Sequence, residues 1–160
     1  MNITYFKSEA GSLANVLIRF VLALVLWPHG AQKLLGWFGG YGFEGTMNYF
    51  TGAMGLPWIL GFLVIIIEFF APALLLLGVW SRVAALGIFV VMVGAMVTSH
   101  LDNGFFMNWF GTQQGEGIEY FILMLGLSAA VIIQGEGRIS LTGLRLTHKT
   151  EVAGKGTGIY

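Results

Sequence analysis

One acidic residue lies deep inside an apolar stretch of the sequence. Glu68 is embedded in LVIIIEFFAP, a composition typical of a membrane-spanning helix. An ionisable side chain there is costly unless it is paired or hydrated, and it suggests a functional site by default. Pro72 has no N–H, so it leaves the Glu68 carbonyl without its helical donor. Two interpretations stay open: Glu68 serves function, or it pairs with Arg19 or His29 to lock helices together.

Two basic residues lie four apart in an earlier apolar stretch, within WPHGAQKLLGWFGGYGFEG. This spacing places His29 and Lys33 on the same helix face. Lys33 lies near the helix end, where its stem can carry the charge to water, whereas His29 lies deeper. A further histidine, His100, ends another apolar stretch. The candidate catalytic residues are therefore Glu68, His29, Lys33 and His100.

Two glycine-rich and aromatic segments follow apolar stretches and share the pattern W-F-G, four residues, E-G, at 37–45 and 109–117. The pattern is consistent with a duplication, and also with the usual enrichment of Trp at membrane interfaces and Gly at helix ends. We expect the polar residues of both segments to form one outer-face cluster. The candidate ligand-binding residues are Trp37, Tyr41, Glu44, Asn103, Trp109, Glu116 and Glu119.

Capping offers a second explanation for two of these residues, because carboxylates such as Glu116 and Glu119 also suit a helix N-terminus. In the first segment, Phe43, Met47, Phe50 and Met54 recur at steps of four, three and four. This spacing predicts a short amphipathic helix. Such a helix either anchors the segment in the membrane interface or covers the outer-face site as a lid.

Four apolar stretches must position these residues, and each has roughly the 20 residues needed to cross the hydrocarbon core. The predicted spans are about 11–35, 56–78, 82–101 and 117–134. We therefore predict an all-α, polytopic membrane protein, with a four-transmembrane-helix bundle over 11–134. Residues 1–10 are predicted to be a cytoplasmic N-terminal lead, and 135–160 a partly disordered cytoplasmic tail.

Composition supports a membrane protein. The 160 residues are 56% hydrophobic and 10% charged, whereas soluble domains have about 25% charged residues. The net charge is zero, which gives no indication of nucleic-acid binding. The chain has no cysteine, which excludes thiolate metal sites and disulfide exchange within it. No metal site is predicted, although a haem between His29 and His100, or a metal held by His and carboxylates, stays open as an alternative.

Orientation follows from the basic residues, most of which fall on one side of a four-span arrangement. These are Lys7, Arg82, Arg138, Arg145, Lys149 and Lys155. The positive-inside rule then predicts that both termini are cytoplasmic.

Several motifs together resemble the DoxX family of small bacterial four-span membrane proteins. They are PHGAQKLLGWFGGYGFEGT, the mid-span glutamate of IIIEFFAPALLLLGVWSRVAAL, HLDNGFFMNW, GEGIEYFILML and GRISL, within residues 13–145. The resemblance implies a four-helix bundle in the bacterial cytoplasmic (inner) membrane. It also implies a relation to the small DoxD-type subunit of a thiosulfate:quinone oxidoreductase, and soluble partners in redox-stress protection.

Three functions follow as hypotheses. The first is an accessory, quinone-interacting subunit of an oxidoreductase system, in which the aromatic segments hold the ring and Glu68 passes protons. The second is a non-enzymatic assembly protein whose polar residues lock the bundle. The third is a small-solute or proton-coupled transporter, for which a homo-oligomer would be required. Whether the chain is itself an enzyme, and which cofactor it uses beyond a possible quinone, stays open.

Overall fold

The computed structural model describes residues 3–143 of the chain, with side chains described from Ser12 onward. The regular elements of this part are all helices, joined by loops, and it contains no strand. Its elements are α1 (Ile3–Leu35), η1 (Trp37–Gly39), α2 (Gly42–Asn48), η2 (Tyr49–Ala53), α3 (Trp58–Leu77), α4 (Ser81–Ser99), η3 (Leu101–Asn103) and α5 (Glu119–Gln134). The predicted all-α class is confirmed for these residues.

Three helices in the described part are long and apolar enough to cross a membrane: Ser12–Leu35, Trp58–Leu77 and Ser81–Ser99. The chain is therefore a multi-pass membrane protein. The apolar α5 has 16 residues, a length of about 24 Å at 1.5 Å per residue, which is shorter than these three. The first helix starts at Ile3, so it continues through most of the stretch predicted as a lead. The predicted tail lies largely outside the described residues.

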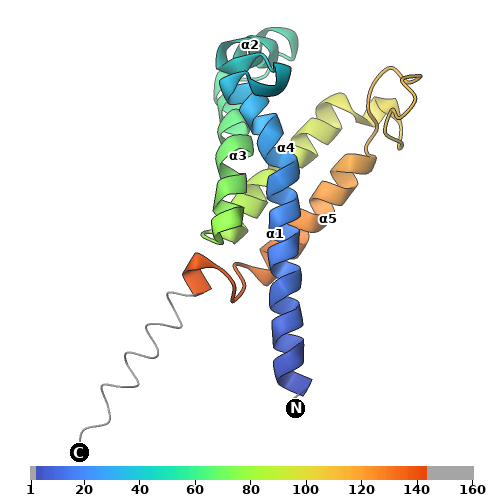
Figure 1. Ribbon diagram of the computed structural model, residues 1–160. Helices are drawn as coiled ribbons and strands as arrows, with labels where there is room; N and C mark the ends of the chain where they lie inside the picture. Colours follow the sequence, from blue (N-terminus) through green and yellow to red (C-terminus); the bar gives the residue numbers. More distant parts are fainter. Residues whose placement is uncertain (1–2, 144–160) are drawn as a thin grey trace, which may run out of the picture.

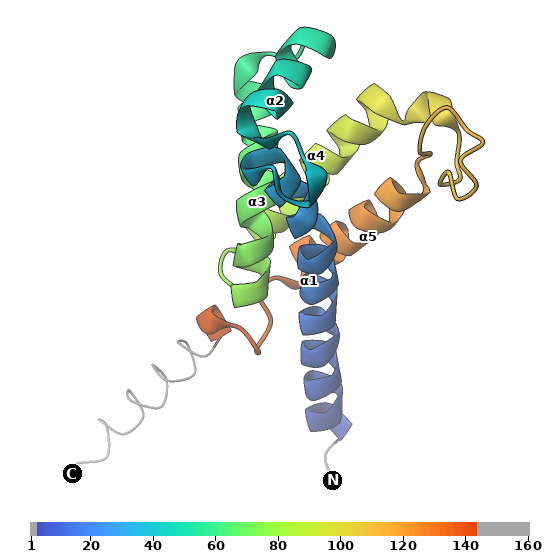
Figure 2. The same cartoon turned by 45° about the horizontal axis from the view of Figure 1, so that its top comes forward.

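The helices form two pairs, α1 with α3 and α4 with α5 (Figure 1). The pairs meet at the end where α3 turns into α4, which we call the tail end, and diverge toward the other end, the loop end (Figure 2). Buried residues from all four helices share one core. These are Leu22, Ala23, Leu26, Ala71, Leu75, Ala84, Ala85, Ile88, Val91, Met92, Phe121, Met124 and Val131.

The tail end is held by polar side chains of α1. Arg19 is only 3% exposed and donates to the Leu75 carbonyl at 3.0 Å and the Ile139 carbonyl at 2.6 Å. Asn15 donates to the Gly135 carbonyl at 3.0 Å. Arg19 thus adds a second donor to the Leu75 carbonyl, which also accepts from the Gly78 N–H at 3.2 Å at the C-terminal end of α3. It ties α1 and α3 to the segment that follows α5.

Replacing Arg19 with methionine is expected to destabilise the protein by about 3 kcal/mol, because the two hydrogen bonds from its buried guanidinium to the Leu75 and Ile139 carbonyls are lost. The measurement is unfolding of the purified protein in detergent micelles. Arg82→Met is the matched control: Arg82 is exposed and its one carbonyl contact, to Ile133, is 3.5 Å long. Equal losses in the two variants would show that the Arg19 hydrogen bonds are not what stabilises this end.

Candidate functional site

The site begins where α1 and α3 cross. Gly30 lies directly against the backbone of Glu68 and Phe69, and a Cβ at residue 30 would lie 2.6 Å from the Phe69 Cα. No real side chain fits at that distance, so the crossing requires glycine. Pro72 interrupts the hydrogen bonding of α3 at the same level, because it cannot donate to the Glu68 carbonyl. A glycine and a proline therefore place the Glu68 backbone against α1.

The carboxylate of Glu68 pairs with Lys33, one turn beyond Gly30 on α1. The Glu68 side chain is 5% exposed and that of Lys33 is 26% exposed. The expectation that Glu68 pairs with Arg19 or His29 is wrong, whereas Lys33 keeps part of its side chain exposed while it pairs with Glu68. The physical reason is that the crossing at Gly30 brings Glu68 within reach of the lysine stem. Each charge then offsets the desolvation of the other.

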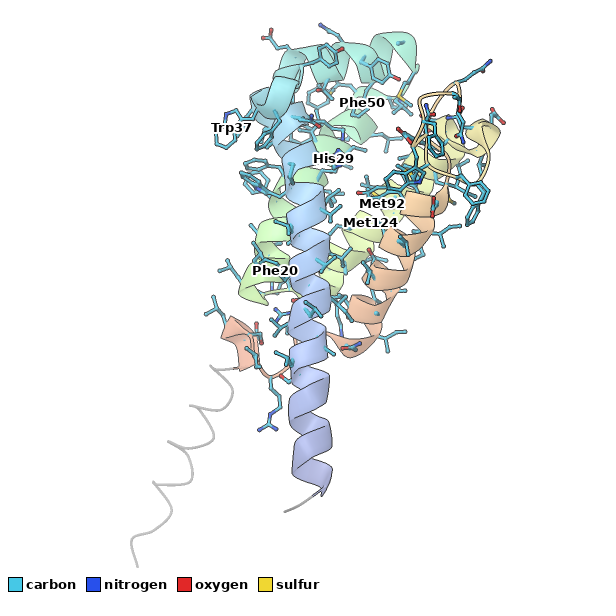
Figure 3. The ribbon with its side chains drawn as sticks, turned by 45° about the vertical axis from the view of Figure 1, so that its right-hand side comes forward. Phe20, His29, Trp37, Phe50, Met92 and Met124 are labelled. Carbon is cyan, nitrogen blue, oxygen red and sulfur yellow. The ribbon has the colours of Figure 1, made fainter. Side chains whose placement is uncertain are left out.

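Two further polar groups lie near this pair. The ring of His29 lies 6.4 Å from the ring of Tyr120, in the first turn of α5. Glu68 interacts electrostatically with both His29 and Tyr120. Figure 3 shows His29 on the loop-end half of α1. In this view it lies between Phe50 of η2 and the side chains of Met92 and Met124, on α4 and α5. We call His29, Lys33, Glu68 and Tyr120 the intramembrane cluster; it joins three helices.

The hydroxyl of Tyr120 is the unusual member of this cluster. Its oxygen is buried, and within the described part of the chain it has no hydrogen-bond partner. Sequence reasoning missed this residue, because a tyrosine at the start of an apolar stretch is common at membrane interfaces. Only the packing of α5 beside α1 brings Tyr120 to His29.

A pocket of about 510 Å³ opens beside Lys33 at the loop end. Its lining residues come from the end of α1 and the segment that follows. They are Gln32, Lys33, Gly39, Gly40, Tyr41, Gly45, Thr46, Tyr49 and Phe50. The segment turns back over α1 because Gly36 and Gly39 adopt positive φ, and because Gly40 packs directly against the Gln32 backbone. Lys33 belongs to both the pocket and the intramembrane cluster.

The predicted amphipathic helix forms as α2 and the π-helical turn η2. Its apolar face packs on protein: Met47 and Phe50 are buried against Ile65 of α3. The expectation that this face lies in the membrane interface is therefore wrong for these two side chains. From the crossing at Gly30, α3 continues about 7 Å farther toward the loop end than α1 does. The segment that contains α2 and η2 covers this extra length of α3.

The second glycine-rich segment lies apart from the first, because α4 diverges from α3 toward the loop end (Figure 1). Its carboxylates serve its own loop: Glu116 accepts from the Asn108 N–H at 2.6 Å, and Glu119 from the Met107 N–H at 3.2 Å. Asn103 donates to the Glu116 carbonyl at 3.1 Å. Trp109 is 77% exposed. The predicted single outer-face cluster is therefore wrong, although a ligand-binding role for either segment stays a prediction.

The remaining predicted residues are Trp37, Glu44 and His100, which lie outside the intramembrane cluster. Trp37 packs edge-on against Trp27 with ring centroids 6.0 Å apart, and Glu44 is exposed on α2. The ring centroids of His100 and Phe121 lie 4.3 Å apart, and the His100 Nδ1 lies 2.9 Å from the Ala95 carbonyl oxygen. A carbonyl only accepts, so Nδ1 carries a proton in this contact. Among the described residues, no three His, Asp or Glu side chains gather as metal ligands would.

The chain is similar to known proteins over most of α1 to α4. The DoxX family model matches residues 14–101, which is more than half of the chain. The chain belongs to the DoxX family. "Putative oxidoreductase CatD" of Bacillus subtilis (strain 168) is 26% identical over 101 residues, 63% of this chain and 70% of that protein. No solved structure matches. The family match contains His29, Lys33 and Glu68, and it ends before α5.

Proposed function

We propose that this DoxX protein is a quinone-interacting membrane subunit of an oxidoreductase system. The observation that carries the proposal is the buried Lys33–Glu68 ion pair, set beside His29 and Tyr120 between membrane-spanning helices. Ionisable groups in such a place are costly and mark ligand or proton sites. The name of the Bacillus subtilis relative supports a redox setting.

The chemistry of a quinone fits this cluster. Its two carbonyl oxygens need hydrogen-bond donors, and its reduced form must gain and lose protons while its tail remains in lipid. Lys33 and His29 are potential donors, and Glu68 can accept a proton. Lys33 also lines the loop-end pocket, so protons exchanged at Glu68 have a route to that pocket. The chain has no cysteine; we assign the electron-carrying centre to a soluble partner protein.

We further propose that α5 is a fourth membrane span and that both termini face the cytoplasm of a bacterial inner membrane. The basic residues Arg82 and Arg138 lie toward the tail end, and the positive-inside rule places that end in the cytoplasm. The loop-end pocket then opens to the outer face. Labelling of single cysteines introduced at residues 41 and 82, with a membrane-impermeant reagent on intact cells, tests this: only residue 41 should react.

Quinone binding is tested in lipid nanodiscs that contain the purified protein. The measurement is the excess of a short-tailed quinone over that in empty discs of the same lipids. Glu68→Gln is expected to weaken binding at least tenfold, because the amide can neither accept a proton nor pair with Lys33 as an ion. Asp102→Asn, at an exposed residue of η3, is the charge-matched control and should bind as the unsubstituted protein does. Unsubstituted protein that takes up no excess quinone would rule out this function.

A second function is favoured by the position of the same ion pair. Because Lys33 and Glu68 join α1 to α3 directly, the pair could serve only to lock the bundle of an assembly protein. In that case quinone binding would be absent and the pair would contribute to stability alone. The variants described in the Discussion separate these two functions.

A further inference from the structure

We infer that Tyr120 donates a hydrogen bond to a carbonyl oxygen of the ligand, which binds on the α1–α5 side of Glu68 rather than in the loop-end pocket. The inference rests on the proposed quinone function and names where in the cluster the head group lies. The family match ends at residue 101, so Tyr120 is added by the structure.

The first argument is the unsatisfied hydroxyl. Buried polar groups in proteins nearly always have a hydrogen-bond partner, and one without a partner calls for an explanation. In a membrane the expectation is stronger, because lipid tails cannot supply the missing bond. The Tyr120 oxygen is buried with no partner among the described residues. A ligand oxygen would satisfy it.

The second argument is the arrangement of the neighbouring groups. His29 is exposed on α1 and faces the Tyr120 ring, and Glu68 interacts electrostatically with both. An acceptor that binds to Tyr120 therefore lies beside His29, a potential second donor, and within the electrostatic influence of Glu68. His29 and Tyr120 come from α1 and α5, so the ligand would contact both helices.

The third argument separates this place from the pocket. Neither His29 nor Tyr120 lines the loop-end pocket, whereas Lys33 does. Glu68 thus pairs with a residue that lines the pocket, Lys33, whereas His29 and Tyr120 contact each other outside the pocket lining. We place the head group at Tyr120, at the start of α5, and not among the residues that line the pocket. The pocket is left to water and to protons.

The ligand class follows from the donor. A neutral phenol donates one hydrogen bond and suits a carbonyl oxygen, and it remains protonated while doing so. Quinones carry carbonyl oxygens on a ring that is soluble in lipid. A polyprenyl lipid without a carbonyl offers no such acceptor, so it should compete poorly for the site.

The test compares Tyr120→Phe and Tyr49→Phe in the nanodisc measurement, with the same short-tailed quinone. Tyr120→Phe is expected to bind about tenfold more weakly, the effect of one lost hydrogen bond. Tyr49, which lines the pocket, is the matched tyrosine, and its variant should bind as the unsubstituted protein does. A polyprenol added in excess should not displace the quinone.

The melting temperature of Tyr120→Phe without ligand distinguishes a ligand-binding hydroxyl from a structural one. Removing a hydroxyl with no partner should leave the melting temperature of Tyr120→Phe unchanged or raise it, and a structural hydroxyl would lower it. Normal binding by Tyr120→Phe overturns this inference and leaves the quinone function standing. Equal weakening in both tyrosine variants also overturns it, because the ring would then extend to the pocket. Unsubstituted protein that binds no quinone overturns both the inference and the proposed function.

Discussion

Replacing Gly30 with alanine is expected to destabilise the protein by about 3 kcal/mol, although the change adds only one methyl group. The added Cβ would meet backbone atoms of Glu68 and Phe69, which cannot rotate away as a side chain can. The helices α1 and α3 must therefore move apart. Because Lys33 and Glu68 lie at the same crossing, quinone binding should fall with stability. Unfolding in detergent micelles and nanodisc binding measure the two effects.

The matched control has the opposite expected sign. Gly94 lies inside α4, and a Cβ there would meet nothing within 4 Å. Gly94→Ala should stabilise the protein by about 0.5–1 kcal/mol, because alanine is the better helix former. If both alanine variants unfold alike, then close approach at the α1–α3 crossing is not what Gly30 provides.

Breaking the ion pair from one side is the second large effect. Lys33→Met leaves the Glu68 carboxylate, 5% exposed, without its partner. Removing one member of a buried pair typically costs about 3–5 kcal/mol. The double variant Lys33→Met with Glu68→Met removes both charges and should recover most of that loss, since apolar replacement of a whole buried pair is often nearly neutral. Both are measured by unfolding in the same detergent.

The double variant also separates the two proposed functions. If the pair only locks α1 to α3, the double variant should behave like the unsubstituted protein in every assay, including assembly with its partners. If the pair belongs to a quinone site, the double variant should be stable and fail to bind quinone. Single and double variants with equal losses of stability would contradict the ion pair itself.

Much of the fold could be predicted from local sequence. Long apolar stretches identify the helices Ser12–Leu35, Trp58–Leu77 and Ser81–Ser99, because lipid requires internally hydrogen-bonded segments of this length. The unusual position of Glu68 was also evident, since a carboxylate is rare in such a stretch. The family followed from several motifs together, and the match over residues 14–101 confirms it.

The partners of Glu68 could not be predicted, because they depend on how helices cross. Hydropathy gives the depth of a residue along a helix, whereas pairing also depends on rotation and crossing point. Gly30 sets that crossing through contact with the α3 backbone, and the result is the pair with Lys33 rather than Arg19. Tyr120 was missed for the same reason. The divergence of the two helix pairs, which separates Trp37 from Trp109, also arises only in three dimensions.

The length of α5 has a consequence for the surrounding lipid. As the proposed fourth span, the 16 residues of α5 cover about 24 Å, against a hydrocarbon core of about 30 Å. Such hydrophobic mismatch is relieved when the bilayer thins locally or when the short helix recruits a neighbour. Tyr120 is the second residue of this helix, so thinning at its loop end brings the headgroup layer toward the intramembrane cluster. Bilayer thickness thus becomes a variable to which the proposed quinone binding should respond.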